Sequence, residues 1–329
     1  MKLVNKLGVR LSMAVKANRV LGYPEKILFE PTNACNLSCP LCPTGNGTLN
    51  RVAGQMRLAD FKRIIDEVRG KTRFIRFSGY GEPIIARDIH SMIRYAHDAG
   101  METHLHSNIL VLNSEGKMDN LLSSGLDGIT VSIDGASQET YEKYRIGGDV
   151  EKAFSILGEL IKKRNSANLQ RPRVRCQMIV TRQNEHEVDA VKARALALGV
   201  ETFFAKTVNL ALIKETGSNE VDKKAVVTFH PKNDKYSRYK DRSPTMENGC
   251  VWLYKEAVIF WNGDVTTCCY DPRGANVMGN IFEAGSLMNV WNGDKYQGLR
   301  KVVSSNIYAA DPLCSNCPDR VYISDSCTS

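Results

Sequence analysis

Strand-like and helix-like segments alternate along most of this chain, and their alternation restricts the fold more than any other feature of the sequence. Such a pattern predicts an α/β protein, with helices packed outside a parallel sheet. Six units are too few to close an eight-stranded barrel. The strand-like runs cover residues 26–32, 72–79, 101–108, 126–135, 173–181 and 200–209. The helix-like segments cover residues 58–70, 86–100, 115–125, 150–165 and 185–199.

The first strand-like run leads into a loop that carries three cysteines. Cys35, Cys39 and Cys42 follow the spacing C-x3-C-x2-C. Three thiolates on one loop can hold three irons of a [4Fe–4S] cube, and the fourth iron then keeps an open coordination site. A zinc site or a redox dithiol is the alternative, but structural zinc is held by four protein ligands. The spacing therefore favours an iron–sulfur cluster with one open iron.

This spacing resembles the signature of the radical S-adenosylmethionine (SAM) enzymes. In that family the open iron binds the amino and carboxylate groups of SAM. An electron from the cluster cleaves SAM to a 5'-deoxyadenosyl radical, which abstracts hydrogen from a substrate. An aromatic residue usually precedes the third cysteine, where this chain has Leu41, and the resemblance places that residue beside the adenine. It also implies a partial (β/α)6 TIM-like barrel with its site at the C-terminal ends of the strands.

The second strand-like run ends in the sequence SGYGEP, residues 78–83. Glycines at such a place allow a sharp turn and a close approach of the backbone to a ligand. The radical SAM family has a Gly-Gly-Glu motif here that binds the SAM amino group. Tyr80 replaces its first glycine, whereas Gly81 and Glu82 remain. A lone motif of this kind would indicate a turn, but its place after the second strand favours contact with the cofactor.

Further cofactor contacts are implied after the third and fourth strands. Ser107 and Asn108 end the third strand-like run, Ser132 lies near the end of the fourth, and Arg145 follows it. In related enzymes residues at these places lie near SAM or bind its carboxylate or ribose. A guanidinium suits that role because it can pair with a carboxylate through two hydrogen bonds.

Other polar residues of the strand-like runs are expected to line the barrel. His104 and His106 face the same side of one strand. A pair of metal ligands is the functional reading, but a polar lining is favoured because no third ligand is evident. Gln177 and Lys206 are expected to line the barrel as well. Cys176 is expected to lie in the core.

A second group of cysteines lies near the C-terminal end of the sequence. Residues 262–263, Asn-Gly, separate two apolar runs and predict a hairpin. A hairpin would bring two of these cysteines together, and a later C-x2-C pair would complete a site of four thiolates, which suits either zinc or an iron–sulfur cluster. The expected ligands are Cys250, Cys268 with Cys269 as its alternative, Cys314 and Cys317.

The second group resembles the SPASM and twitch domains, which follow a radical SAM barrel and hold auxiliary [4Fe–4S] clusters. The further cysteines of the two-cluster SPASM pattern are missing, so the resemblance implies one auxiliary cluster, closer to the twitch type. Asp271 is placed like the acidic base of the sulfatase-maturating enzymes in that group. A turn before Pro272 explains this aspartate equally well. Cys327 has no assigned role.

Residues 2–21 predict a basic amphipathic helix, since no acidic residue precedes Glu25. A helix of this kind can lie on an anionic membrane or near a lipid-like substrate. The favoured interpretation is instead a helix packed across the barrel by its apolar side. That side consists of Leu3, Val4, Leu7, Leu11, Ala14 and Val15.

Charge and hydropathy give only broad limits. The net charge of +8 selects no partner, and without a basic block interleaved with aromatics a nucleic acid is disfavoured. The sequence has neither an apolar run near 18 residues nor a signal-peptide pattern, so we expect a cytoplasmic protein. Peripheral contact with the membrane through residues 2–21 is compatible with this expectation. The expected parts are an N-terminal helix (1–24), the barrel (25–213), a connecting segment (214–249) and an auxiliary-cluster domain (250–329).

The resemblance to twitch relatives implies redox modification of a small polar substrate, by dehydrogenation or epimerisation. A sugar or an aminocyclitol would be such a substrate. Modification of a peptide, a protein or a lipid by the same radical chemistry is the alternative. A further alternative is a non-catalytic protein that binds an iron–sulfur cluster or zinc. The polar residues at successive strand ends argue against this alternative. Flavodoxin or ferredoxin is the expected electron donor.

Overall fold

The computed structural model describes residues 1–113, 116–208, 228–236, 250–305, 307, 311–315 and 317. Most of the expected connecting segment, 214–249, and Cys327 lie outside these ranges.

Nine strands form a single sheet within the described ranges, and six of them confirm the predicted parallel barrel. In chain order they are β1 (Lys26–Phe29), β2 (Phe74–Phe77), β3 (Glu102–Ser107), β4 (Gly128–Ser132), β5 (Arg173–Val180), β6 (Thr202–Thr207), β7 (Glu256–Ile259), β8 (Asp264–Thr266) and β9 (Val277–Asn280). Across the sheet the order is β6-β5-β4-β3-β2-β1-β7-β8-β9. Neighbours among β1 to β6 pair in parallel, so the sheet is a partial TIM-like barrel with its strand ends on one side.

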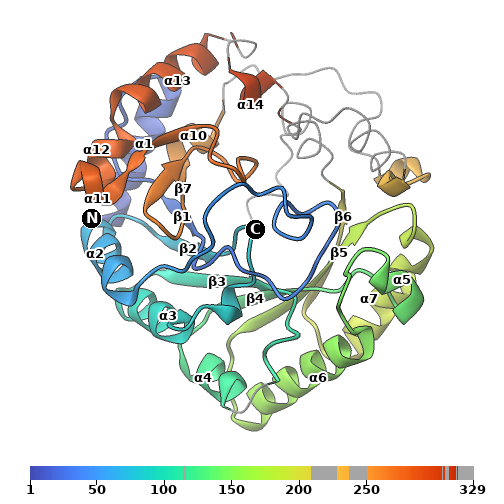
Figure 1. The fold of residues 1–329 in the computed structure, drawn as a ribbon. Coiled ribbons are helices and arrows are strands. Elements are labelled where there is room, and N and C mark those ends of the chain that lie inside the picture. The colour runs from blue at the N-terminus through green and yellow to red at the C-terminus, as the bar shows by residue number, and fades with distance from the viewer. Residues whose placement is uncertain are drawn as a thin grey trace.

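Helices surround this sheet on its outer side, as Figure 1 shows for α2, α3, α4, α6 and α7. The helices are α1 (Lys2–Ala14), α2 (Leu58–Val68), α3 (Ile89–Asp98), α4 (Lys117–Ser123), α5 (Gln138–Glu142), α6 (Val150–Ser166), α7 (Val188–Ala197), α10 (Trp252–Lys255), α11 (Ile281–Ala284), α12 (Leu287–Trp291), α13 (Asp294–Ser304) and α14 (Pro312–Ser315). Three 3-10 segments are η1 (Pro83–Ile85), η2 (Glu185–Glu187) and η3 (Asp234–Tyr236).

The spacing of apolar residues explains why these helices cover the sheet. In α2 the buried residues Phe61, Ile64, Ile65 and Val68 recur at helical spacing and form one stripe. The longest helix, α6, begins where the side chain of Asp149 accepts a hydrogen bond from the backbone N–H of the third residue beyond it. Helix and strand side chains then share one core.

Alternation along the strands gives the sheet two different faces. The outer face consists of core residues such as Ile75, Leu105 and Val131, which are fully buried against the helices. Cys176 belongs to this core and is fully buried, as predicted. The inner face, turned away from the helices, is polar. It carries Arg76 of β2, His104 and His106 of β3, Thr130 and Ser132 of β4, Arg175 and Gln177 of β5, and Lys206 of β6.

The C-terminal strands continue the barrel sheet. β7 pairs in parallel with the free edge of β1, from Lys26 opposite Glu256 onward. The predicted hairpin is confirmed, because β7 and β8 are antiparallel and join at Gly263, whose φ of +88° suits a glycine. The apolar run before the hairpin is only partly a strand, because its residues 252–255 form the helix α10.

The interpretation of the N-terminal helix needs correction. α1 ends at Ala14, well before residue 21, and its apolar side does not pack across the barrel. Leu7 and Leu11 are 57% and 55% exposed, whereas Asn5, Val9 and Ser12 are buried. The helix therefore contacts the body of the protein through a narrow, partly polar stripe. In the described part of the chain, no helix combines the length and the apolar character needed to span a bilayer.

Candidate active site

The three cysteines of the first group share the loop that follows β1, which Figure 1 shows in dark blue crossing the centre of the molecule. Burial raises the pKa of Cys35 to about 11, and charges on Cys39 and Cys42 add to the rise. The three thiols of this loop therefore influence one another's charge. The loop is tight at Gly45, where a Cβ would lie 2.4 Å from the backbone nitrogen of Cys39.

Two side-chain donors point at sulfurs of this loop. Asn108 Nδ2 lies 4.0 Å from Cys35 Sγ, and Arg145 Nη1 lies 3.9 Å from Cys39 Sγ. N–H groups aimed at sulfur favour the thiolate, which is the form that binds iron. The donor set thus fits a cluster held by three thiolates. Within the described ranges, no three His, Cys, Asp or Glu side chains are grouped as ligands of a single metal ion.

The predicted Glu82, Ser107 and Asn108 come together at the ends of β2 and β3. The Glu82 carboxylate is 2% exposed. It accepts hydrogen bonds from Ser107 Oγ at 2.8 Å, from the backbone N–H of Asn108 at 2.7 Å and from that of Ile84 at 3.1 Å. Burial raises the pKa of Glu82, while these three bonds oppose the rise. A carboxylate held in this way is oriented for a cationic ligand.

Glycines let this segment approach the cysteine loop closely. A Cβ on Gly81 would lie 2.2 Å from the carbonyl oxygen of Thr32, so only glycine fits there. Asn108 reaches the same loop, because its Nδ2 also donates to Asn36 Oδ1 at 2.9 Å. The structure therefore places the Gly81–Glu82 motif against the loop that carries the cysteines.

Arg145 is fixed by an ion pair that sequence analysis did not identify. Its Nε donates to Asp134 Oδ2 at 2.5 Å, and Asp134 is fully buried. Burial raises the pKa of Asp134, whereas the Arg145 charge and a hydrogen bond from the backbone N–H of Ile179 lower it. The guanidinium is thereby held beside Cys39. In the sequence Asp134 directly precedes Gly135, where an aspartate is also typical of a turn.

Leu41 and Ser132 have separate surroundings. Leu41 is 6% exposed and packs in a small apolar cluster with Tyr144 and Phe229. Ser132 Oγ accepts a hydrogen bond from Gln177 Nε2 at 2.7 Å, which joins the ends of β4 and β5 on the inner face. Among the described residues, no hydrogen bond links either of them to the Glu82 network.

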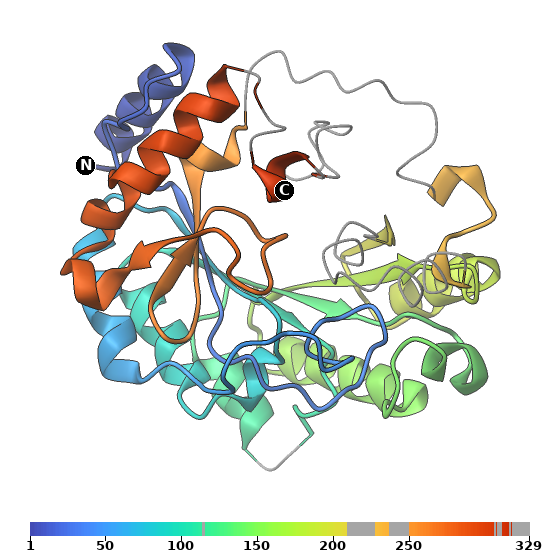
Figure 2. The ribbon, with the colours of Figure 1, turned by 45° about the horizontal axis from the view of Figure 1, so that its top comes forward.

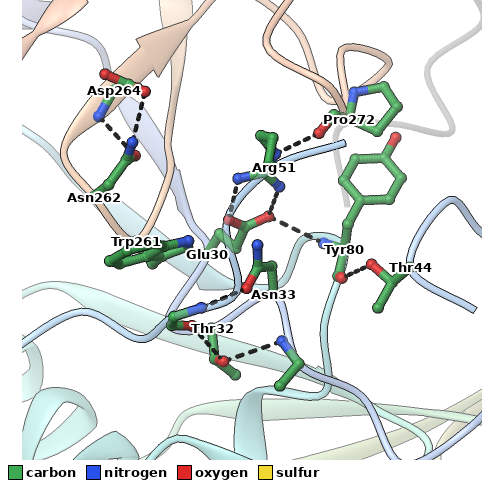
Figure 3. Close-up of polar contacts among 12 residues, drawn as sticks. Glu30, Thr32, Asn33, Thr44, Arg51, Tyr80, Trp261, Asn262, Asp264 and Pro272 are labelled. Atoms are coloured by element: carbon green, nitrogen blue, oxygen red, sulfur yellow. Dashed lines mark hydrogen bonds and ion pairs between the residues drawn. The ribbon is translucent and has the colours of Figure 1, made fainter. Parts of the chain in front are cut away.

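A buried ion pair that the sequence did not reveal anchors the cysteine loop. Arg51 binds both carboxylate oxygens of Glu30, at 2.8 and 2.6 Å. Its Nε donates to the carbonyl of Pro272 at 2.7 Å, and its guanidinium lies 3.9 Å from the ring centre of Phe260. Figure 3 shows Arg51 between Glu30 and Pro272. The loop after β1 is thus fastened to the C-terminal part of the chain.

Tyr80 makes a second connection of this kind. Its backbone N–H reaches Glu30 Oε2 at 3.4 Å, and its carbonyl accepts from Thr44 Oγ1 (Figure 3). Its hydroxyl donates to the carbonyl of Cys269 at 2.6 Å. Burial raises the pKa of the Tyr80 hydroxyl well above its usual value, and the charge of Cys269 adds to this. The residue that departs from the Gly-Gly-Glu pattern therefore joins the two cysteine regions.

Two of the other expected auxiliary cysteines, Cys268 and Cys314, lie near Cys250. The charge of Cys250 contributes to the raised pKa of Cys314, after burial and Asp311. It also contributes to the raised pKa of Cys268, where the hydrogen bond with Cys269 and burial are larger. Cys317 follows Cys314 in a turn closed by a 3.3 Å backbone hydrogen bond.

The neighbouring residues Cys268 and Cys269 make different contacts. Cys268 lies beside Cys250, whereas Cys269 packs with Leu28, Val258 and Phe260 and accepts the Tyr80 hydrogen bond at its carbonyl. Cys268 as the fourth thiolate, with Cys269 as its alternative, stays a prediction.

The Asp271 carboxylate is engaged within its own turn. Asp271 is 1% exposed and accepts from Thr266 Oγ1 at 2.5 Å and from the backbone N–H groups of Ala275 and Asn276 at 2.7 and 2.9 Å. These bonds account for both carboxylate oxygens. The geometry fits the turn role, and the catalytic base stays a prediction.

The inner face of the sheet is positively charged. Burial lowers the pKa of His104 to about 3, helped by Arg175 and Arg76, and the pKa of His106 is lowered in the same way. The two imidazoles lie 5.3 Å apart and His104 Nε2 is 2.8 Å from Thr130 Oγ1. Neutral histidines among cations suit a polar lining, as the sequence favoured.

Two family models match the chain. The model described as Radical SAM superfamily matches residues 29–195, and the model SPASM, an iron–sulfur cluster-binding domain, matches residues 250–318. Together they cover the cysteine loop, the strand-end residues and the second group of cysteines.

Curated relatives match over different lengths. AdoMet-dependent heme synthase from Methanosarcina barkeri is 35% identical over 122 residues, which are 37% of this chain and only 34% of that protein. Mycofactocin maturase MftC from Mycobacterium tuberculosis is 23% identical over 91% of this chain and 77% of its own length. A cofactor-modifying protein of the tungsten-containing aldehyde ferredoxin oxidoreductase, from Pyrococcus furiosus, is 23% identical over 88% of this chain and 86% of its own.

Solved structures share the fold over most of the chain. Streptococcus suis SuiB bound to S-adenosylmethionine has a TM-score of 0.65 at 17% identity, covering 90% of this chain and 71% of that one. SuiB bound to precursor peptide SuiA has a TM-score of 0.64 at 16% identity, covering 90% and 70%. BtrN in complex with AdoMet and 2-DOIA has a TM-score of 0.52 at 18% identity, covering 89% and 92%.

Proposed function

The chain belongs to the radical SAM superfamily and carries a SPASM iron–sulfur cluster-binding domain, and from this premise we propose that it is an enzyme that modifies a peptide by removing a hydrogen atom from it. The two domains imply a [4Fe–4S] cluster, an auxiliary iron–sulfur cluster and bound SAM. When bound, the first cluster supplies the electron that cleaves SAM and yields the hydrogen-abstracting 5'-deoxyadenosyl group. Cys35, Cys39 and Cys42 would hold that cluster, and Cys250, Cys268, Cys314 and Cys317 would hold the auxiliary one.

The observation that carries the proposal is the convergence of buried polar groups on the cysteine loop. Glu82 is oriented by Ser107 and Asn108, and it offers a carboxylate to the amino group of SAM. Arg145 is oriented by Asp134, and its remaining N–H groups can pair with a carboxylate. A cationic group and an anionic group on either side of one loop match the two ends of an amino acid. This supports SAM binding beside Cys35 and Cys39.

The remaining predicted contacts have supporting roles in this proposal. Leu41 offers an apolar surface within the cysteine loop, and Gly81 allows the backbone after β2 to pass close to this loop. Ser132 is held by Gln177 at the end of β4. We propose that the three residues shape the space around the adenosine. Flavodoxin or ferredoxin is proposed as the electron donor.

A peptide substrate is supported by similarity to proteins that act on or bind a peptide. PqqA peptide cyclase from Rhodopseudomonas palustris is 30% identical over 39% of this chain, and SuiB, solved with a precursor peptide, shares the fold over 90% of it. These similarities favour a peptide over the sugar or aminocyclitol expected from the sequence.

A small polar substrate is the second candidate, and the inner face of the sheet favours it. Arg76, Arg175 and Lys206 lie around the two neutral histidines there. Glu256 balances one of these charges, since it pairs with Arg76 Nη2 at 2.9 Å. A polar, cationic lining suits a compact anionic molecule that makes several hydrogen bonds.

The first experiment tests the radical SAM activity itself. Protein reconstituted under anaerobic conditions is mixed with dithionite and SAM, and 5'-deoxyadenosine is measured by chromatography. Wild type is expected to form it and to contain about eight irons per chain. Cys42→Ala should lose about four irons and all product, whereas Cys176→Ala, which removes a core thiol, should keep both. Equal behaviour of the two variants would contradict the assignment of the loop.

The second experiment separates the two substrate classes. Extract from cells grown in deuterated medium is divided by ultrafiltration, and each fraction is added to the reaction. Deuterium in 5'-deoxyadenosine reports hydrogen abstraction from the added material. A peptide substrate predicts a donor that proteinase treatment destroys. A donor that passes a small-molecule filter and resists proteinase would overturn the peptide proposal and favour the second candidate.

A further inference from the structure

The N-terminal helix presents an apolar surface to solvent. Of the twelve large hydrophobic residues that are exposed in the described part of the chain, seven lie within the first 21 residues. Those on one side of α1 form what we call the apolar face. Its members, with their exposed fractions, are Leu3 (69%), Val4 (73%), Leu7 (57%), Leu11 (55%) and Val15 (65%), the last being the capping residue directly after the helix. Isolated exposed leucines are common, but a continuous group of this kind indicates a binding surface.

The apolar face points away from the protein. At 100° per residue, Asn5, Val9 and Ser12 lie on the side of the helix opposite the apolar face. These three residues are the buried ones. Figure 2 shows α1 at the edge of the molecule, beyond α13. The helix is therefore turned with its more apolar side outward.

Specific contacts fix this orientation. Asn5 exchanges two hydrogen bonds with the backbone of Tyr23, at 3.0 and 2.8 Å. Ser12 Oγ accepts from the backbone N–H of Leu21 at 2.9 Å. A Cβ on Gly8 would lie 2.3 Å from the carbonyl oxygen of Leu21, so the helix can pack this closely only at a glycine. Rolling the helix to bury its leucines would break all of these contacts.

The segment that holds α1 is itself fastened to the C-terminal helices. The backbone of Val20 donates to Asn292 Oδ1 at 2.9 Å and accepts from Asn292 Nδ2 at 3.0 Å. The buried Arg300 donates from Nη1 to the carbonyl of Asn18 at 3.1 Å. The apolar face is thus a fixed feature of the folded protein.

The charge around the apolar face indicates its partner. Residues 1–24 contain no acidic residue and five basic ones, at positions 2, 6, 10, 16 and 19. Arg10 lies on the flank of α1 next to the apolar face, and Lys6 lies further round on the same flank. Leucine and valine on one side with lysine and arginine beside them are what a helix needs to lie in the headgroup region of an anionic bilayer. Two weak attractions, apolar insertion and basic charge, together hold a protein at a membrane.

We propose that the apolar face of α1 docks the protein on the surface of an anionic lipid bilayer. The helix lies parallel to the membrane, with Leu3, Leu7 and Leu11 inserted among the lipids and the basic flank against the headgroups. The barrel is then held at the membrane by the segment between α1 and β1. This inference does not depend on whether the substrate is a peptide or a small molecule.

Co-sedimentation of the complete, cluster-loaded protein with vesicles tests the proposal. Vesicles of equal parts phosphatidylglycerol and phosphatidylcholine serve as the anionic surface, and vesicles of phosphatidylcholine alone as the neutral one. Binding is expected on the anionic vesicles, and high salt should weaken it because ions screen the basic charges. Leu7→Asp/Leu11→Asp should lower the partition by roughly tenfold or more, since two inserted side chains become charged. Lys6→Gln/Arg10→Gln should lower it by roughly tenfold to thirtyfold.

Leu196→Asp is the matched control, because Leu196 is an exposed leucine (45%) on a different helix, α7. It should bind vesicles as wild type does, and all variants should still form 5'-deoxyadenosine at the wild-type rate. No binding of wild type to anionic vesicles would overturn the proposal. So would equal binding by Leu7→Asp/Leu11→Asp and Leu196→Asp. A wild-type dimer in gel filtration that Leu7→Asp/Leu11→Asp converts to a monomer, without vesicle binding, would assign the apolar face to a second copy of this chain instead.

Discussion

Replacing Arg51 with methionine should free the cysteine loop from the C-terminal part of the chain. Arg51 is the only side chain that pairs with Glu30 in the hydrogen bonds of the described residues, and the two side chains are 12% and 0% exposed. Removing one partner of such a pair costs about 3–5 kcal/mol, because it leaves a buried charge without its counterion. Loss of the donor to Pro272 and of the contact with Phe260 adds about 1 kcal/mol each.

Hydrogen exchange measured by mass spectrometry on the anaerobic holoprotein reports this change. Amide exchange in the loop proceeds through local opening, so its rate follows the opening free energy. Loss of the ion pair alone, at about 3–5 kcal/mol, corresponds to exchange that is about 10²–10⁴-fold faster in peptides from residues 30–57. The loop is expected to show this increase while peptides from the strands β4 and β5 stay unchanged.

Arg57→Met provides the control within the same stretch of chain. Arg57 also makes an ion pair, to Asp60 at 2.6 Å, but its side chain is 80% exposed. Exposed pairs of this kind contribute little, so exchange should not change measurably. Glu30→Gln combined with Arg51→Met should be less destabilised than Arg51→Met alone, because no unpaired charge remains. If Arg51→Met exchanges no faster than Arg57→Met, the buried pair does not anchor the loop.

Three further outcomes are expected. Tyr80→Phe removes the 2.6 Å bond to the carbonyl of Cys269, and should lower the stability of the holoprotein by about 1–2 kcal/mol in thermal unfolding; an unchanged midpoint would speak against this link. Burial and Arg175 lower the pKa of His104 from 6.5 to about 3, so unfolding takes up a proton and stability falls as the pH drops through this window, by about 1.4 kcal/mol per pH unit. His104→Gln should reduce that slope in urea titrations, and an identical slope would refute it. Glu82→Gln should weaken SAM binding by about 10–100-fold in calorimetry, since a charge-assisted bond is lost; unaltered affinity would remove Glu82 from the site.

The sequence was sufficient for features that depend on local pattern. The alternation of strand-like and helix-like segments predicted the parallel sheet. Glu82 and Asn108 follow strands of this sheet, and so does the cysteine loop. They were therefore expected at the same edge of the sheet, because the C-terminal ends of parallel strands lie together. The hairpin at Gly263 followed from turn chemistry alone.

Features that depend on which surfaces meet could not be predicted in this way. The amphipathic pattern predicted that α1 has an apolar side. It did not show that the hydrogen bonds of Asn5 and Ser12 would turn this side toward solvent. The pairing of β7 with β1 joins segments far apart in the chain, and a four-residue strand carries no sign of its partner. The hydrogen bond between Tyr80 and Cys269 likewise requires two loops to be placed first.

The position of β1 within the sheet has a consequence for biosynthesis. β1 lies between β2 and β7, so one of its edges finds a partner only after Glu256–Ile259 has been made. Ribosomes add about 5–20 residues per second, so this edge stays open for on the order of tens of seconds. Strand pairing across such a separation is also slow, because a long loop must close first.

An unpaired edge during that interval is where other nascent chains can attach. The strand that leads into the cysteine loop is therefore completed last, although it emerges first. A polypeptide shortened before β7 would keep β1 permanently uncovered on that side, and aggregation during expression would be its characteristic failure.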